Sequence, residues 1–186
     1  MTKKFNSVLI IGMGLIGSSI SRALIENHVA NNVYGLDSDS KVIKKCQNLN
    51  ILIQGETELK NFDFQFDLVI ICTPLSTYKQ IFQSLSEFVS QPTLVTDVGS
   101  TKMSTINDFK NIKENRNMTF IPSHPIAGLE KSGPEHGFSK LFDNRYCILT
   151  PYEKNDDSIN KISEMWKSIG MKIEIMDADR HDRVLA

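Results

Sequence analysis

The sequence predicts an α/β fold in which a doubly wound, mostly parallel sheet carries helices on both faces. Short apolar runs rich in Val and Ile recur along the chain with little polar alternation, which is typical of strands covered on both sides. Between many of these runs lie segments with the 3.6-residue apolar period of a helix. Alternating strands and helices predict parallel strands joined by right-handed crossovers, with ligands bound at the carboxyl ends of the strands.

Each expected strand is an apolar run bounded by turn residues. The strands are expected at residues 8–12, 32–37, 67–73, 93–99, 119–123, 146–150 and 172–177. The clearest helices are expected at residues 76–89 and 156–170, where the apolar side chains share one face and Gly170 supplies a C-terminal stop. The longest stretch without a clear period, residues 127–145, is a candidate functional loop.

Composition narrows the class of protein. With 186 residues and 40% hydrophobic content, the chain can form one main domain with a substantial core. The 21 basic and 22 acidic residues form no long basic run, which argues against nucleic-acid or membrane-surface partners. The three cysteines lie far apart without C-x-x-C spacing, so we expect a reduced, cytoplasmic setting and no metal site. We also expect neither a signal peptide nor a membrane span, because no cleavage site follows the first apolar run and no run approaches about 20 residues.

The segment GMGLIG has the G-x-G-x-x-G spacing, with glycines at Gly12, Gly14 and Gly17. It directly follows an expected strand and opens an amphipathic helix, the context in which this spacing binds a dinucleotide. Gly12 permits a tight turn, Gly14 a close approach of the pyrophosphate, and Gly17 close packing of helix and strand. Leu15 and Ile16 would then present backbone N–H groups at the helix start, where the helix dipole favours an anion.

Asp37 ends the second expected strand, about 20 residues beyond Gly17, where a carboxylate accepts hydrogen bonds from the adenosine ribose. An acid at this position repels a 2′-phosphate, so we expect NAD rather than NADP. The alternative is an ordinary glycine turn with a surface aspartate. The pattern predicts a Rossmann-like NAD-binding domain over residues 1–176.

Two further segments, DVGSTK and PSHPIAG, follow strands whose carboxyl ends should face the nicotinamide half of the cofactor. In the first, Ser100 or Thr101 could cap the following helix, contribute to the site, or do both. In the second, His124 could be a structural histidine or a positioned base. We favour the base, because the flanking Pro122 and Pro125 remove backbone donors and stiffen the chain.

In this order, GMGLIG, DLVIICTP, DVGSTK and HPIAGLEKSG resemble the prephenate and arogenate dehydrogenases of tyrosine biosynthesis. The glycine motif is common to many nucleotide-binding enzymes, whereas the histidine segment is specific to this family. The resemblance implies NAD-dependent oxidative decarboxylation of prephenate to 4-hydroxyphenylpyruvate, or of arogenate to tyrosine. It also implies that Thr73 and Pro74 lie beside the cofactor.

The same resemblance implies roles around the substrate. His124 would accept the hydrogen bond of the substrate hydroxyl, and Ser100 would bridge the histidine, the hydroxyl and the nicotinamide. Thr101 would lie next to the substrate. Glu130 would belong to a polar gate, although a solvated loop carboxylate is an equal alternative.

Residues 177–186 are expected to begin a helix with Asp177 as its N-cap. In the resembled family this helix leads into an all-helical domain that forms the homodimer and supplies the arginine for the substrate carboxylate. We therefore expect a truncated or split enzyme, dimeric only if that domain is supplied, with His181 and Asp182 on a solvated helix start. Two other functions stay open: a hydroxyacid reductase, which the histidine segment disfavours, and an NAD-binding module without turnover.

Overall fold

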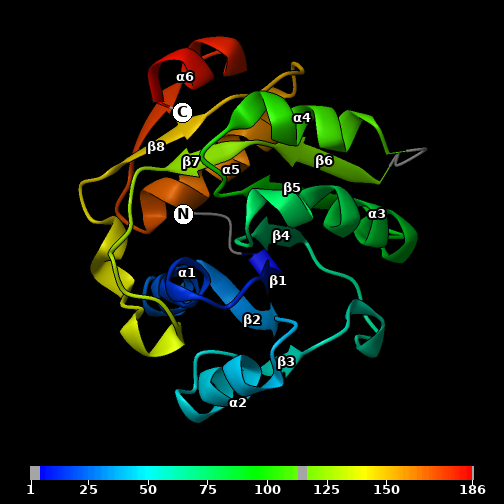
Figure 1. Cartoon of the computed structure of the whole chain (residues 1–186), viewed down its shortest axis with the longest axis vertical. Helices are drawn as coiled ribbons and strands as arrows, with labels where there is room; N and C mark the ends of the chain where they lie inside the picture. Colours follow the sequence, from blue (N-terminus) through cyan, green and yellow to red (C-terminus); the bar gives the residue numbers. More distant parts are fainter. Residues whose placement is uncertain (1–4, 113–116, 186) are drawn as a thin grey trace.

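The computed structural model describes residues 5–112 and 117–185. Six parallel strands form the main sheet in the order β3-β2-β1-β4-β5-β6 (Figure 1). The strands are β1 (Phe5–Ile11), β2 (Ala30–Leu36), β3 (Gln54–Glu56), β4 (Leu68–Ile71), β5 (Thr93–Asp97) and β6 (Met118–Ile121). The order reverses between β1 and β4, as in dinucleotide-binding folds, so the predicted fold class is confirmed.

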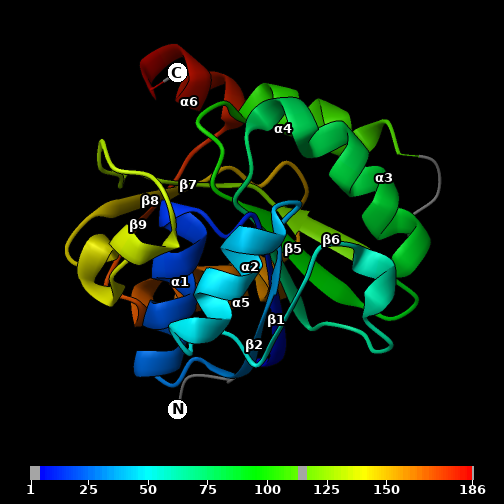
Figure 2. The same cartoon turned by 60° about the horizontal axis from the view of Figure 1, so that its bottom comes forward.

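Helices cover both faces of this sheet (Figure 2). They are α1 (Leu15–Glu26), α2 (Ser40–Asn48), α3 (Tyr78–Phe88), α4 (Lys102–Lys110) and α5 (Asp156–Ser168). One apolar cluster joins α1, α2 and α5 to one face of the sheet, with Trp166 among its fully buried members. A second, aromatic cluster joins α3 and α4 to the other face, with Phe82 at its centre. The expected apolar faces of α3 and α5 are confirmed, and α5 is followed by Gly170 at φ +99°.

A second sheet extends the first beyond β6. It contains β7 (Ser123–Pro125), antiparallel to β8 (Tyr146–Leu149), which is parallel to β9 (Lys172–Ile175). The expected strand at residues 119–123 is therefore divided at Pro122, which has no N–H to continue the ladder. The short edge strand β3 was not predicted, because three residues with a central glycine show no usable apolar pattern.

The last helix, α6 (Ala178–Leu185), packs against α4 (Figure 1). Its N-cap is Asp177 as predicted, since the backbone N–H of Arg180 donates to Asp177 Oδ1 at 2.8 Å. Short 3₁₀ turns connect other elements, at Leu59–Asn61, Leu75–Thr77, Pro134–His136 and Ser139–Phe142. Within the described ranges, every helix is too short or too polar to cross a bilayer.

Candidate active site

Close backbone approach requires two of the three glycines after β1. Gly12 has φ +92°, and a Cβ there would lie 2.9 Å from the backbone carbonyl of Cys72 at the end of β4. A Cβ on Gly17 would lie 2.0 Å from the carbonyl oxygen of Gly12. The turn is thus packed tightly between the first strand, the neighbouring strand and the helix, as the motif predicts.

At the start of α1 the backbone is open to its surroundings rather than tightly packed. A Cβ built on Gly14 meets nothing within 4 Å, and among the described residues no side chain caps the helix. The first helical hydrogen bond runs from the N–H of Ser18 to the carbonyl of Gly14, at 3.0 Å. The N–H groups of Leu15, Ile16 and Gly17 precede that bond, at the positive end of the helix dipole. An anionic group can therefore approach the backbone here.

Asp37 follows β2 directly and faces the glycine turn. Its Oδ2 accepts a hydrogen bond from the N–H of Met13 at 2.8 Å, and its Oδ1 accepts one from the N–H of Asp39 at 3.0 Å. The turn is fastened to β2 a second time, because the N–H of Gly12 donates to the carbonyl of Leu36 at 2.7 Å. The carboxylate is held at the strand end where a ribose would lie in a bound dinucleotide.

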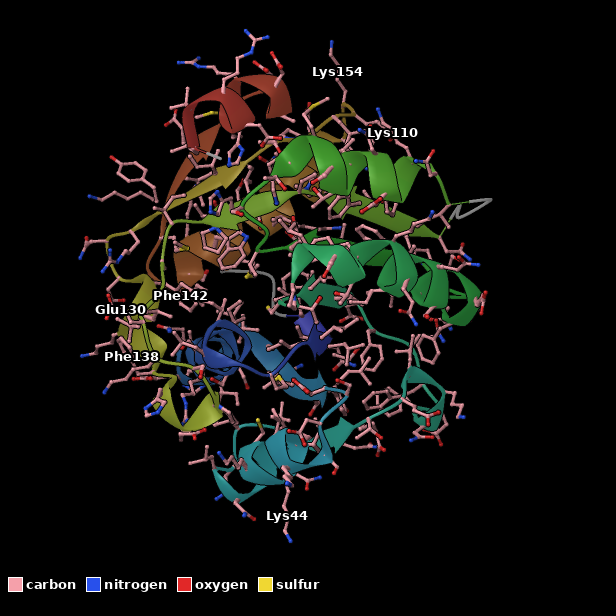
Figure 3. The ribbon with its side chains drawn as sticks, viewed as in Figure 1. Lys44, Lys110, Glu130, Phe138, Phe142 and Lys154 are labelled. Carbon is pink, nitrogen blue, oxygen red and sulfur yellow. The ribbon has the colours of Figure 1, made fainter. Side chains whose placement is uncertain are left out.

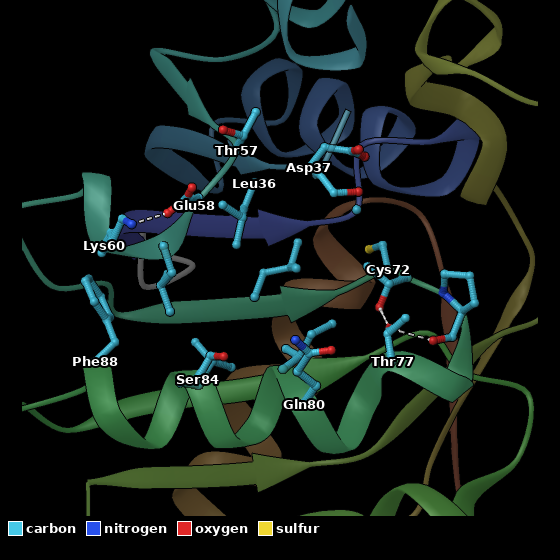
Figure 4. A pocket seen from close by; sticks show the side chains of 18 of the residues that line it. Leu36, Asp37, Thr57, Glu58, Lys60, Cys72, Thr77, Gln80, Ser84 and Phe88 are labelled. Carbon is cyan, nitrogen blue, oxygen red and sulfur yellow. Dashed lines mark hydrogen bonds and ion pairs between the residues drawn. The ribbon is translucent and has the colours of Figure 1, made fainter. Parts of the chain in front are cut away.

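A cleft of about 960 Å³ opens at this edge of the sheet. Gly12, Gly14, Asp37, Thr73 and Pro74 line it, so the structure brings these expected cofactor-binding residues together. Figure 4 shows Asp37 and Thr57 on the side of β2 and β3, with Gln80 and Ser84 of α3 across the cleft. The Thr77 hydroxyl donates to the carbonyl of Pro74 at 2.7 Å and lies 2.8 Å from the Thr73 hydroxyl, whose hydrogen it can accept.

Farther along the same edge, Asp97 ends β5 and joins the two segments DVGSTK and PSHPIAG. Its carboxylate is fully buried and accepts hydrogen bonds from the N–H groups of Gly99 at 3.0 Å and Ser123 at 2.9 Å. The ammonium of Lys102 lies 2.6 Å from Asp97 Oδ2 and 2.7 Å from the carbonyl oxygen of Ser123. This buried ion pair fixes the backbone immediately before His124.

His124 lies on β7, opposite Ile148 of β8, and its side chain is partly exposed. Its Nδ1 is 2.9 Å from Nε2 of His181, and Nδ1 of His181 is 2.7 Å from Oδ1 of Asp182. The expected base is thus linked through a second histidine to a carboxylate. Because β6 is parallel to β1, His124 lies beyond the same end of the sheet as the glycine turn.

The expectation that His181 and Asp182 are solvated is wrong. The side chain of His181 is 0% exposed, and Asp182 accepts hydrogen bonds from the N–H groups of Lys102 at 2.8 Å and Met103 at 2.9 Å. Asp182 therefore supplies the N-terminal cap of α4 from another helix. The polar sequence around these residues gave no sign of burial, because α6 buries one turn only where it meets α4 and His124.

The surroundings keep His124 neutral. Burial lowers the pKa of His124 to about 4, with further lowering by the ammonium of Lys102 and by His181, against the opposing effect of Asp182. Burial would raise the pKa of Asp182, but hydrogen bonds from Lys102, Met103 and His181 outweigh it and hold the pKa below its usual range. The pKa of Lys102 is lowered by burial, which its partner Asp97 opposes.

Ser100 and Thr101 lie in the turn from β5 into α4. Ser100 is exposed at the carboxyl end of β5, and Thr101 occupies the N-cap position of α4. The side chain of Thr101 makes no capping hydrogen bond. Its hydroxyl pairs instead with that of Ser104 at 2.8 Å, while Asp182 caps the helix. Simple capping by the side chain of Thr101 is therefore excluded, and both hydroxyls border the end of the sheet that carries His124.

The expected functional loop, residues 127–145, has two distinct parts. From Pro134 onward it packs on α1, where a Cβ on Gly137 would lie 2.2 Å from Oγ of Ser18. Phe142 in this second part is fully buried, so this half is structural cover rather than a loop at a site entrance. Glu130 lies in the exposed first part, on the same side of the molecule as Phe142 (Figure 3).

Sequence reasoning missed four residues of this site: Asp97, Lys102, His181 and Asp182. Asp97 and Lys102 enclose the turn that holds Ser100 and Thr101, and a charged residue at each end of a short turn after an apolar strand was a usable signal. For His181 the only available signal was that the chain has just four histidines.

Comparisons with known proteins agree with this geometry. Residues 20–175 match the family model described as prephenate dehydrogenase, nucleotide-binding domain. A cyclohexadienyl dehydrogenase of Zymomonas mobilis is 33% identical over 184 residues, and a prephenate dehydrogenase of Lactococcus lactis is 30% identical over 178. These alignments cover 98% and 95% of this chain but 62% and 48% of the relatives, so the chain spans about half to two thirds of their length.

Solved structures give the same result. A crystal structure of prephenate dehydrogenase from A. aeolicus, in complex with hydroxyphenyl propionate and NAD+, has a TM-score of 0.91 and 33% identity, covering 99% of this chain and 64% of that chain. An arogenate dehydrogenase from Synechocystis has a TM-score of 0.85 at 22% identity, covering 95% of this chain and 62% of that chain, and shares the fold. The chain thus belongs to the prephenate dehydrogenase family, and the part of that family it matches is the nucleotide-binding domain.

Proposed function

We propose that this chain binds NAD and supplies the base for the oxidative decarboxylation of prephenate or arogenate. The observation that carries the proposal is the position of His124. It is a partly exposed histidine at the same end of a parallel sheet as an uncapped, glycine-rich helix start. A nucleotide cleft and a positioned base at one sheet edge are what a dehydrogenase requires.

The cleft fits the nucleotide. The open space beside Gly14 and the N–H groups of Leu15, Ile16 and Gly17 would receive the pyrophosphate. Asp37 would accept hydrogen bonds from the ribose hydroxyls and disfavour the 2′-phosphate of NADP, while Thr73 and Pro74 would border the path toward His124. Bound NAD would supply the hydride acceptor.

The base then acts on the ring hydroxyl. As the hydride leaves the carbon that bears this hydroxyl, the O–H group becomes strongly acidic, so its proton can pass to a weak base such as neutral His124. The bond to the ring carboxylate breaks, carbon dioxide leaves, and the electron pair of that bond makes the ring aromatic. The phenolate oxygen then takes the proton back. The low pKa of His124 keeps the imidazole ready to accept at neutral pH.

Three further residues belong to the proposed substrate side. Ser100 would bridge the substrate hydroxyl and His124, and Thr101 would line the same turn. Glu130 would gate the entrance from its exposed loop. The exposure of Ser100 and Glu130 and the partial exposure of Thr101 support these roles, because a ligand can reach each side chain.

Two measurements test the proposal. The chain is mixed with NAD and either prephenate or arogenate, and the near-ultraviolet absorbance of reduced cofactor is followed. His124→Asn should lower the turnover rate by about 10²–10⁴-fold and leave NAD affinity unchanged. Turnover that survives His124→Asn would remove His124 as the base.

The partial match to the relatives supports a second candidate function, because this chain spans only 62% and 48% of the length of two of these proteins. In this alternative the chain binds NAD and does not turn substrate over by itself. Calorimetric NAD binding without any reduction of the cofactor would support it. Calorimetric NAD binding and the absorbance of reduced cofactor are therefore measured on the same protein sample.

A further inference from the structure

Three side chains from two distant segments form a continuous polar chain behind the candidate base. Nδ1 of His124 lies 2.9 Å from Nε2 of His181, and Nδ1 of His181 lies 2.7 Å from Oδ1 of Asp182. His181 is completely buried, and Asp182 is also held by two backbone N–H groups at the start of α4. The middle of the chain is thus buried and its far end is fixed to the backbone, while Asp182 and His124 are each partly exposed.

The carboxylate determines where the protons lie along this chain. Asp182 already accepts hydrogen bonds from two backbone N–H groups and stays ionised, so it accepts from the ring nitrogen that faces it. His181 therefore carries its proton on Nδ1. In a neutral His181 the other nitrogen, Nε2, is then an acceptor, and it must receive a hydrogen from Nδ1 of His124.

This order of donors leaves one possibility for His124. Its proton resides on Nδ1, so its Nε2 has a free lone pair and can accept a proton. The opposite tautomer would present an N–H group to the substrate hydroxyl and could not act as a base. The same logic governs the orienting carboxylate of hydrolytic triads, where the wrong tautomer abolishes most of the activity.

We infer that His181 and Asp182 are positioning residues, which hold His124 in the Nδ1–H tautomer with Nε2 as the proton acceptor. The inference rests on the proposed function for its catalytic consequence, although the tautomer itself can be measured without any substrate. His181 acts directly on the base. Asp182 acts through His181 and joins this network to the start of α4.

His181 is the position to change, because altering Asp182 would also remove the cap of α4. Glutamine and methionine are similar in size and uncharged, but only glutamine offers an oxygen that can accept the hydrogen of His124 Nδ1. His181→Gln and His181→Met therefore form a matched pair. They separate loss of the acceptor from loss of the buried ring.

The decisive measurement is the ¹⁵N chemical shift of the His124 ring nitrogens in the 186-residue chain, assigned with the His124→Asn variant as a blank. This shift distinguishes a protonated ring nitrogen from a bare one. We expect the Nδ1–H tautomer in the wild type and in His181→Gln, and a mixture of tautomers in His181→Met. A wild type with the hydrogen on Nε2, or with a doubly protonated His181, would overturn the inference. Unchanged spectra in His181→Met would do the same.

Turnover gives the second readout. His181→Met should reduce kcat by about 10²–10³-fold with little change in KM for NAD, and His181→Gln should recover most of that loss. Equal losses in both variants would indicate a purely structural role and overturn the inference. If the wild type shows the expected tautomer but no NAD reduction, the proposed function fails while the assignment of the positioning pair stands.

Discussion

The ammonium of Lys102 lies 2.6 Å from Oδ2 of Asp97, and both side chains are completely excluded from solvent. Removing one partner of such a pair leaves an uncompensated buried charge. Asp97→Asn should therefore lower the free energy of unfolding by about 3–5 kcal/mol, as measured by urea denaturation. Lys45 and Glu135 form a pair of similar length, 2.8 Å, at the surface, so Lys45→Met is the matched control and should change little. Equal effects of the two substitutions would contradict the buried pair's structural role.

The second and third glycines of the motif, Gly14 and Gly17, should respond differently to the same added methyl group. In Gly17→Ala the Cβ would meet the carbonyl oxygen of Gly12 at 2.0 Å, so we expect destabilisation of about 3 kcal/mol. In Gly14→Ala the Cβ meets no protein atom within 4 Å, so stability should be unchanged. The methyl would instead occupy the approach of the pyrophosphate and weaken NAD binding about tenfold or more. Thermal unfolding and calorimetry measure the two effects, and Gly14→Ala with wild-type NAD affinity would disprove the pyrophosphate site.

Asp37 should set the preference between the two nicotinamide cofactors. Replacing it with serine removes the ribose acceptor and the charge that repels a 2′-phosphate. We expect Asp37→Ser to bind NAD about tenfold more weakly and to narrow the gap between NAD and NADP, as measured by calorimetry with each cofactor. Asp39→Ser is the control, because that side chain accepts the N–H of Lys41 at the start of α2, away from the glycine turn. A gap between the cofactors that stays constant in Asp37→Ser would exclude Asp37 as the selecting residue.

His124 should make stability depend on pH in a defined window. Its pKa is about 4 in the folded chain and 6.5 as an ordinary side chain, so between these values the unfolded state binds the extra proton. Folding is therefore disfavoured as pH falls through this range. In His124→Asn this penalty is absent. The variant should gain about 1–2 kcal/mol relative to the wild type between about pH 7 and pH 5, measured by urea denaturation. Parallel pH profiles of the two proteins would show that the folded pKa of His124 is not lowered.

The fold of the nucleotide-binding part could be predicted from the sequence almost completely. Apolar runs and one glycine motif predicted the parallel sheet, the turn at Gly12 and the position of Asp37, because each of these leaves a local pattern of apolar residues, glycines or a carboxylate in the sequence. The surroundings of the proposed base depend on distant contacts. His181 lies 57 residues from His124, and Asp182 caps a helix that starts 80 residues earlier. No local periodicity records such contacts, so a buried histidine in a polar segment was read as solvated.

The second half of the loop at residues 127–145 also depends on contacts that its local sequence does not predict. Its glycine, proline and charges are typical of a mobile segment, yet Gly137 is required for close packing on Ser18, and Phe142 lies in the core. The missing period reflected two short 3₁₀ turns, which are too brief to show one.

The eight-residue helix α6 holds the partner of His124, whereas the walls of the nucleotide cleft come from β1, β2, β4 and α3. If α6 detaches from α4 on warming, His124 loses its orienting neighbour while the cleft remains intact. Local opening of a short helix with a single buried residue requires less free energy than global unfolding. On heating, the proposed turnover should therefore be lost at a lower temperature than the binding of NAD.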